Sequence, residues 1–228
     1  MTHAKQLQTN FRLIAMTQPV DEMKEVGVTT PLELIAFCAR VSNPKNQLNS
    51  ATAGKLIKSL VARREWSPLE QVDLTFEIIT ARDITRQILR HKSFSPQEFS
   101  QRYAEVDESQ FCTREARIKH DTDRQSSVEC TSAEDIDWWL QAQLSVLEVT
   151  QGVYRDALKR NFAKEVARVV LPEGLTLSTL YMKGSIRSWI HYLALRNGNG
   201  TQKEHQQIAL GISAAVSKLF PVEEVTGG

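Results

Sequence analysis

The sequence has few cysteines and none of the signals of export, membrane insertion or metal binding. Its 228 residues include three cysteines, Cys38, Cys112 and Cys130, which lie far apart and never form a Cys-x-x-Cys pair. Cysteines this sparse provide no disulfide framework and are typical of a reducing compartment. There is no His-Glu-x-x-His motif and no cysteine cluster, so we predict no metal site. Without an N-terminal apolar run or a membrane-length stretch, we expect a cytoplasmic protein with no membrane partner.

The standard phosphate-binding loops and nucleophile motifs are also missing. The sequence contains no G-x-x-x-x-G-K-[ST], no strand-linked G-x-G-x-x-G and no G-x-S-x-G. We interpret the glycines of "NGNG" at 197–200 as a helix stop. Cys38 lies on an apolar helical face, and Cys112 and Cys130 lie in a polar stretch, so a thiolate nucleophile has no positive support.

A surplus of positive charge is absent as well. Lysine and arginine number 28 against 27 aspartates and glutamates, which gives a net charge of +1. A dedicated duplex-DNA binder usually carries a basic surplus, so we expect no nucleic-acid partner and only a local site for any anion. Hydrophobic residues make up 41% of the chain, which is enough to bury a core.

Hydrophobic periodicity predicts a helix-rich α+β fold. Strands are predicted from alternating or apolar runs at 11–16, 72–79 and 175–182. Helices are predicted from a possible N-cap at Thr30 followed by Pro31, and from helical spacing at 51–64, 81–91, 137–162, 184–196 and 202–219. We expect a single domain over residues 1–228 around a small, largely antiparallel sheet, with a polar insertion at about 105–135.

Several polar and aromatic side chains of these helices can be interpreted structurally. Glu204 and His205 fit a solvated helix face, and Trp138 and Trp139 are expected in the core or at an interface. His191 fits a satisfied core histidine as well as it fits a ligand contact.

One segment, "RHKSFSPQEFSQRY" at 90–103, gathers an unusual number of cations and hydroxyls. Its cations end a predicted helix whose dipole they match, so a solvated helix end is the simplest interpretation of Arg90 and His91. In extended geometry, however, the side chains at 98, 100 and 102 point the same way. Ser100 and Arg102 are donors suited to a phosphate. We therefore predict that the segment binds an anionic, hydrogen-bonding small molecule.

The same segment resembles the signature RHRxxSxNxxSxRY of the flavin-dependent thymidylate synthases. Lys92 and Gln97 stand where the family usually has arginine and asparagine, and Lys92 loses the planar fork of arginine. The similarity continues, in the family's order, through "ARVS" at 39–42, "EWSPLEQ" at 65–71, "ARVVLP" at 167–172, "GSIRSWIHYLALR" at 184–196 and "TQKEHQQIA" at 201–209.

The resemblance implies an FAD-dependent methyltransferase that converts deoxyuridine monophosphate (dUMP) to dTMP. The one-carbon donor would be 5,10-methylenetetrahydrofolate, the reductant NADPH, and no cysteine nucleophile would be used. Enzymes of this family are homotetramers whose active sites form where subunits meet, so the resemblance also implies that assembly. A flavin-dependent hydroxymethylase on the same scaffold and a catalytically silent nucleotide-binding homologue are the alternatives.

The resemblance also assigns residues to dUMP and to FAD. For dUMP the matching positions are Gln87, Arg90, Glu98, Phe99, Ser100, Gln101, Arg102, Arg168 and Arg196. For FAD they are Ser42, Ser67, Glu70, Arg90, His91, Lys92, Ser93, Glu98, Ser185, Ile186, Arg187 and His191. Arg196 would be catalytic, because a fixed guanidinium lowers the cost of negative charge on the uracil ring.

Some of these residues also have a purely structural interpretation. Ser67 fits an ordinary turn or helix start, and Ser42 fits a helix cap. Arg168 could pair locally with Glu165 or Glu173, because a buried guanidinium needs an anion.

Overall fold

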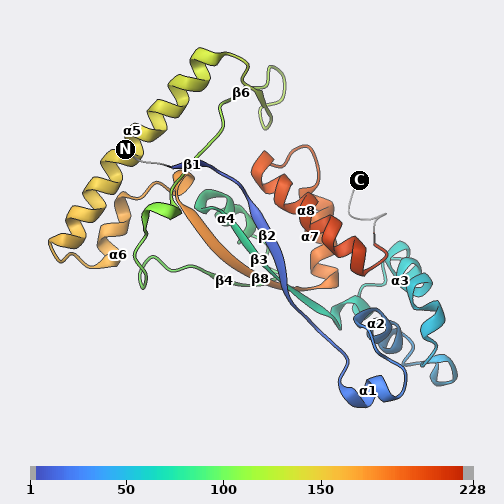
Figure 1. Cartoon of the computed structure of the whole chain (residues 1–228). Helices are drawn as coiled ribbons and strands as arrows, with labels where there is room; N and C mark the ends of the chain where they lie inside the picture. Colours follow the sequence, from blue (N-terminus) through green and yellow to red (C-terminus); the bar gives the residue numbers. More distant parts are fainter. Residues whose placement is uncertain (1–3, 223–228) are drawn as a thin grey trace. The chain divides into compact units, whose positions relative to one another are not determined.

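The computed structural model describes residues 4–222 and contains both helices and strands, as predicted (Figure 1). The strands are β1 (Lys5–Gln6), β2 (Asn10–Met16), β3 (Asp73–Ala81), β4 (Ser95–Glu98), β5 (Cys112–Thr113), β6 (Arg117–Lys119), β7 (Ser127–Glu129) and β8 (Leu177–Ser185). The α-helices are α1 (Asp21–Glu25), α2 (Pro31–Ala39), α3 (Ala53–Ala62), α4 (Arg82–Ile88), α5 (Ala133–Lys159), α6 (Lys164–Ala167), α7 (Ile186–Arg196) and α8 (Lys203–Leu219). Among the described helices, none is long and apolar enough to cross a membrane.

The main sheet has four strands in the order β2-β3-β8-β4. Two small sheets accompany it: β1 pairs with β5 in parallel, and β6 pairs with β7 in antiparallel orientation. The three predicted strands are confirmed as β2, β3 and β8, with ends that differ by up to three residues. In β3 the alternation holds at Leu74, Phe76 and Ile78, which are all fully buried.

By its contacts the chain divides into two compact units. Unit 1 comprises Met1–Asn10, Ile78–Arg90 and Gln97–Leu180, and unit 2 comprises Phe11–Glu77, His91–Pro96 and Tyr181–Gly228. Boundaries fall inside β2, β3, β4 and β8, so each strand of the main sheet contributes to both units.

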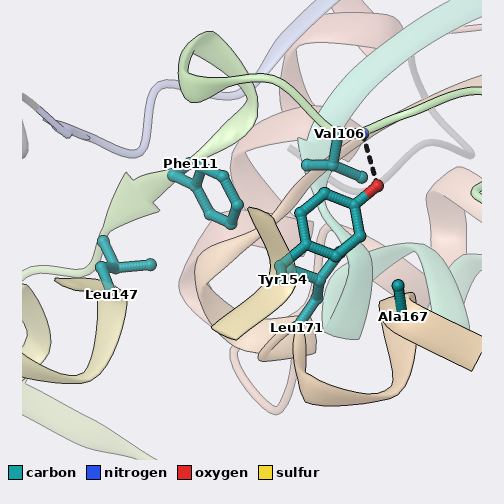
Figure 2. Packing of buried hydrophobic residues seen from close by; sticks show 6 residues of the cluster. All are labelled: Val106, Phe111, Leu147, Tyr154, Ala167 and Leu171. Atoms are coloured by element: carbon teal, nitrogen blue, oxygen red, sulfur yellow. Dashed lines mark hydrogen bonds between the residues drawn. The ribbon is translucent and has the colours of Figure 1, made fainter. Parts of the chain in front are cut away.

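The core of unit 1 packs around helix α5. Figure 2 shows this cluster, whose buried members are Val106, Phe111, Leu147, Tyr154, Ala167 and Leu171. The Tyr154 hydroxyl accepts a hydrogen bond from the backbone N–H of Val106 at 3.1 Å. The beginning of the predicted polar insertion therefore belongs to the core, because Val106 and Phe111 anchor it there. Its later part forms the β6–β7 hairpin.

Unit 2 contains helices α2, α3, α7 and α8, of which α7 and α8 lie side by side (Figure 1). Its core is aromatic: Phe76 and Phe94 contact Trp189 edge-on, with ring centroids 4.9 and 4.7 Å away. The Trp189 indole N–H donates to the Leu74 carbonyl at 3.2 Å, which satisfies its one polar atom.

The start of α2 confirms the predicted cap. The Thr30 hydroxyl accepts from the Glu33 N–H at 3.2 Å, and the Glu33 carboxylate accepts from the Thr30 N–H at 2.9 Å. This reciprocal pair is a capping box, and Pro31 occupies the first helical position, where its missing N–H costs nothing.

Two glycines inside helices provide a matched stability test. A methyl group added at Gly152 of α5 meets no heavy atom within 4 Å, whereas one added at Gly211 of α8 overlaps the Phe11 ring. Gly152→Ala should therefore raise the free energy of unfolding by about 0.5–1 kcal/mol through helix propensity. Gly211→Ala should lower it by about 1–3 kcal/mol, because overpacking outweighs that gain.

Thermal unfolding of both variants beside the wild type measures the difference. A Gly211→Ala protein that is as stable as Gly152→Ala would show that Phe11 does not pack against α8.

Candidate functional site

In unit 1, the Glu98 carboxylate is the centre of a polar cluster. It accepts hydrogen bonds from the Arg86 guanidinium at 2.7 and 2.8 Å, from the Thr85 hydroxyl at 3.1 Å and from the Ser178 hydroxyl at 2.9 Å. Arg82 forms an ion pair with the same carboxylate at 3.5 Å. Glu98, predicted to contact ligands, is therefore already fixed by four neighbouring side chains.

Arg82 was not predicted, although it is the most buried cation of this cluster. Only 8% of the residue is exposed, and its Nη1 also donates to the Phe99 carbonyl at 3.4 Å. Burial lowers the pKa of this guanidinium, and Glu98 opposes that shift. A signal was available, because Arg82, Thr85 and Arg86 lie at i, i+3 and i+4 on one helical face.

The predicted geometry of the segment at 90–103 is wrong in two respects. Helix α4 ends at Ile88, so Arg90 and His91 lie beyond the helix and not on one of its faces. Strand β4 ends at Glu98, and the chain then turns, with the Tyr103 N–H donating to the Ser100 carbonyl at 3.1 Å. The alternation expected at 98, 100 and 102 is therefore broken, because a turn replaces the extended backbone.

The remaining predicted substrate residues of unit 1 differ in their partners. Arg102 donates through Nε to Glu165 at 3.2 Å, and the Ser100 hydroxyl accepts from the Arg102 N–H at 3.4 Å. Gln101 is 95% buried, and within residues 4–222 its side-chain Nε2 has no hydrogen-bond partner. Gln87 and Phe99 are half-buried.

Two predicted cations that belong to unit 1, Arg90 and Arg168, are not neutralised by a carboxylate among the described residues. Within the described part of the chain, neither guanidinium forms a hydrogen bond or an ion pair, and neither residue is buried. The local pairing considered for Arg168 is not seen, because Glu165 pairs with Arg102 and Glu173 lies 3.7 Å from Arg86. Cations without a carboxylate are suited to an anionic ligand.

In unit 2, five predicted flavin residues line one polar cavity of about 470 Å³: Glu70, Ser93, Ser185, Arg187 and His191. The remaining lining residues were not predicted: Asp73, Ser95, Lys183, Gly184 and Ser188. Of these, Asp73 and Lys183 form an ion pair at 2.8 Å. Asp73 lies in β3 and Lys183 in β8, two strands whose pairing could not be predicted from the sequence.

Local hydrogen bonds fix the wall of this cavity. The Ser185 hydroxyl caps α7 by accepting from the Ser188 N–H at 3.3 Å, and the Ser188 hydroxyl donates to the Ser93 carbonyl at 3.1 Å. Arg187 forms an ion pair with Glu70. The segments at 65–71, 90–103 and 184–196 therefore meet at the cavity.

His191 faces this cavity and is exposed, which favours the ligand contact over the core histidine considered for it. Its ring lies edge-on to Trp66 with centroids 4.6 Å apart. Burial lowers the pKa of His191, and the nearby Arg187 charge lowers it further, so the neutral imidazole is favoured at neutral pH.

The other predicted flavin residues lie outside this lining. Ser42 lines a separate cavity of about 500 Å³ in unit 2, and Lys92 is exposed. Ser67 begins a 3₁₀ turn, Ser67–Glu70, without capping it through its side chain. Ile186 is fully buried, so only its backbone is suited to a ligand contact. Arg90 and Glu98 belong to unit 1.

Arg196, the predicted catalytic residue, is the last residue of α7. Its Nε donates to His91 Nε2 at 2.9 Å, which joins residues 105 positions apart in the sequence. This contact links the segment at 90–103 to the segment at 184–196.

His205 corrects a prediction, because it does not lie on a solvated face. It is fully buried and shares the buried face of α8 with Ile208, Ala209, Ile212 and Val216. Burial first of all, and then the nearby positive charge of Arg196, lowers its pKa to about 3. The helical spacing of this face was visible in the sequence, but the imidazole was assigned by its polarity alone.

Trp138 and Trp139 are not core residues, since 65% and 38% of their surfaces are exposed. The three cysteines are free, and burial raises the pKa of Cys112 to about 11 and that of Cys38 above its usual value. Residues 4–222 contain no group of three or more side chains placed to ligate a metal.

Comparison with known proteins points in one direction. The family described as "Thymidylate synthase complementing protein" matches residues 26–222. A probable flavin-dependent thymidylate synthase of Paramecium bursaria Chlorella virus 1 is 44% identical over 92% of this chain and 94% of its own. A flavin-dependent thymidylate synthase of a Synechocystis strain is 43% identical over 93% of this chain and 96% of its own.

A solved structure has the same fold. The UMP/dUMP methylase PolB of Streptomyces cacaoi, bound with 5-Br dUMP, superposes with a TM-score of 0.81 over 98% of this chain and 96% of its own. Its sequence is 24% identical, so this likeness concerns the fold alone.

The Glu98 cluster yields a stability prediction. Glu98→Gln removes the charge that neutralises Arg82, where both side chains are at most 15% exposed, and should lower the free energy of unfolding by about 2–4 kcal/mol. Glu165→Gln is the matched control, because its ion pair with Arg102 is half-exposed and should matter by less than about 1 kcal/mol.

Denaturant unfolding of the two variants checks this. Equal stability losses would show that Glu98 does not neutralise a buried charge.

Proposed function

The chain belongs to the family of flavin-dependent thymidylate synthases, and from that premise we propose that it catalyses the reductive methylation of dUMP to dTMP. In this proposal the whole chain forms one catalytic domain, 5,10-methylenetetrahydrofolate donates the one-carbon unit, and NADPH reduces the bound FAD. One observation carries the proposal furthest. Two family segments about a hundred residues apart meet through the Arg196–His91 and Ser188–Ser93 hydrogen bonds beside a polar cavity.

The cavity of unit 2 fits part of a flavin cofactor. Its volume of about 470 Å³ lies in the range of ligand sites, and its lining offers hydroxyls, a guanidinium and an imidazole. The residues that would hold FAD are the predicted ones: Ser42, Ser67, Glu70, Arg90, His91, Lys92, Ser93, Glu98, Ser185, Ile186, Arg187 and His191. When bound, the reduced flavin supplies the reducing equivalents that complete the methyl group.

For dUMP, we assign the phosphate to Ser100, Arg102 and Arg168. The Arg168 guanidinium has no carboxylate partner among the described residues, and Arg102 has only a half-exposed one, so a phosphate can recruit both. Gln87 and Glu98 are suited to the sugar hydroxyls or a base edge, with Phe99 and Gln101 contributing backbone groups.

Arg196 is assigned to the uracil. A guanidinium keeps its charge at any physiological pH, so it stabilises negative charge that develops on the ring and lowers the cost of ionising N3. A cysteine nucleophile is not needed, and the raised pKa values of Cys38 and Cys112 disfavour a thiolate at either position.

The function is tested by incubating the protein with dUMP, 5,10-methylenetetrahydrofolate, NADPH and FAD. Mass spectrometry then measures the mass of the nucleotide product. We expect a gain of one methyl group that is lost when FAD is omitted from flavin-stripped protein. Arg196→Ala should lower kcat by about a hundredfold or more while changing FAD affinity by less than about threefold.

Other products have distinct meanings. A hydroxymethylated nucleotide would assign the chain to a sister reaction, and no product from flavin-loaded protein would refute catalysis on dUMP. Wild-type turnover by Arg196→Ala would contradict the role of that residue.

We also propose a homotetramer, and an exposed apolar seam on α5 supports self-association. The seam consists of Trp139, Ala142, Val146, Val149 and Val153, which repeat with the alternating three- and four-residue spacing of paired helices. Its large side chains are 38–65% exposed. This surface fits the interface role that was one of the two expectations for Trp139.

A charged residue placed in the seam tests whether it is a subunit interface. Val149→Glu should shift the protein to a smaller species, because a carboxylate buried between helices loses its hydration. Gln141→Glu is the control, since Gln141 is exposed on the same helix outside the seam. Light scattering after size-exclusion chromatography measures the mass, and an unchanged mass for Val149→Glu would exclude the seam as an interface.

A further inference from the structure

A buried tyrosine–histidine pair lies inside unit 2 and has no part in the proposed chemistry. The Tyr192 hydroxyl and His205 Nε2 are 2.9 Å apart, and the two residues are 1% and 0% exposed. Tyr192 comes from α7 and His205 from α8. Each of these buried polar groups satisfies the other, so removing either partner leaves a buried polar group unsatisfied.

The pair forms a wall against which His91 lies. The His91 and Tyr192 rings meet edge-on with centroids 4.8 Å apart and an interplanar angle of 82°. The His205 ring lies 6.5 Å from His91, nearly perpendicular to it. Tyr192 is itself held between neighbours, with Phe94 and Trp189 at 5.8 and 5.7 Å.

The hydrogen bond between Arg196 and His91 determines the protonation of His91. A guanidinium can only donate, so His91 Nε2 must accept and its ring proton must reside on Nδ1. The neutral imidazole, in one tautomer and one orientation, is the only form that makes this contact. The bond engages Arg196 through Nε, so His91 leaves the two terminal amino groups to other acceptors.

Helix α8 also holds the end of α7 that carries Arg196. Gln206, next to His205, donates through Nε2 to the Asn197 carbonyl at 2.9 Å and to the Gly198 carbonyl at 3.2 Å. Two consecutive residues of α8 therefore contact the end of α7. Gln206 binds its backbone carbonyls, and His205 binds the Tyr192 hydroxyl.

We propose that Tyr192 and His205 are positioning residues for catalysis. Their hydrogen bond locks the Tyr192 ring, the ring fixes the orientation of the His91 imidazole, and His91 in turn holds the Arg196 guanidinium. This inference rests on the proposed role of Arg196 toward the uracil. Displacing a reacting group by about 1 Å can reduce a rate about a hundredfold, so a small shift of Arg196 would lower kcat strongly.

Four variants test the lock. Tyr192→Phe and His205→Leu each remove the hydrogen bond, the double variant removes both partners, and Tyr154→Phe is the control. Tyr154 also carries a hydrogen-bonded hydroxyl and is 2% exposed, but it lies in unit 1 outside the proposed site. We expect kcat to fall about tenfold or more in both single variants, with KM for dUMP and FAD affinity changed less than about threefold.

Comparison of kcat with thermal stability separates positioning from simple structural support. Each single variant leaves one buried polar group without its partner and should melt earlier, whereas the double variant should recover stability. Positioning predicts that kcat stays low in the double variant and that Tyr154→Phe, although destabilised, keeps its kcat. Recovery of kcat together with stability would overturn the proposal.

A crystal structure of unliganded Tyr192→Phe provides a readout that does not depend on turnover. The proposal predicts that the distance from Arg196 Nε to His91 Nε2 exceeds hydrogen-bonding range, about 3.5 Å. An unchanged bond would refute the lock. If the wild type makes no dTMP, the proposed function fails, while this distance still decides whether the pair holds Arg196.

Discussion

Arg196 is a permanently charged side chain whose nitrogens can only donate hydrogen bonds, so it needs a neutral or anionic acceptor at a fixed place. The protein provides one in His91, and the contact at 2.9 Å requires the imidazole to be neutral. Much of unit 2 serves this geometry. Helix α7 buries Ile186, Trp189 and Leu193, while its other face presents residues to the polar cavity. One helix therefore joins the core to the cavity, and its end carries Arg196, the proposed catalytic cation, where the helix dipole favours positive charge.

In unit 1 the arginines differ in whether a carboxylate neutralises them. Several arginines lie in or beside the segment at 90–103 although the chain as a whole is nearly neutral. The buried one, Arg82, is neutralised by Glu98, which is also held by Arg86, Thr85 and Ser178. Glu98 therefore acts as a fixed point from which the following turn begins. Arg168, in contrast, keeps an unneutralised charge, which is what a phosphate requires.

Local patterns in the sequence predicted most elements of the fold. The alternation in β3 and the N-cap at Thr30 depend on neighbouring residues, so both could be predicted and both are confirmed. The prediction failed where tertiary contacts or a change of backbone decided the outcome. The turn after Glu98 replaces an extended segment, and α4 ends before Arg90. His205 was assigned to solvent because it is polar, although its helical spacing matches buried neighbours.

The candidate site was predicted by family resemblance rather than by physical reasoning from single residues. That resemblance brought Glu70, Ser93, Ser185, Arg187 and His191 to one cavity. It did not predict the ion pairs of Asp73 with Lys183 or of Arg82 with Glu98. The two partners of each pair lie in segments that are separate in the sequence. The Tyr192–His205 pair was missed for another reason: His205 was assigned to solvent by its polarity, so no buried partner was sought for it.

The most direct test of the proposed site is a crystal structure of the protein with FAD and 5-bromo-dUMP, whose bromine marks carbon 5 of the uracil by anomalous scattering. We expect the bromine beside an Arg196 guanidinium, the phosphate at Ser100 and Arg102, and the flavin against the cavity that Ser93, Arg187 and His191 line. An ordered flavin with the bromine far from every Arg196, or a nucleotide bound without contact to Arg102, would contradict the proposed mechanism.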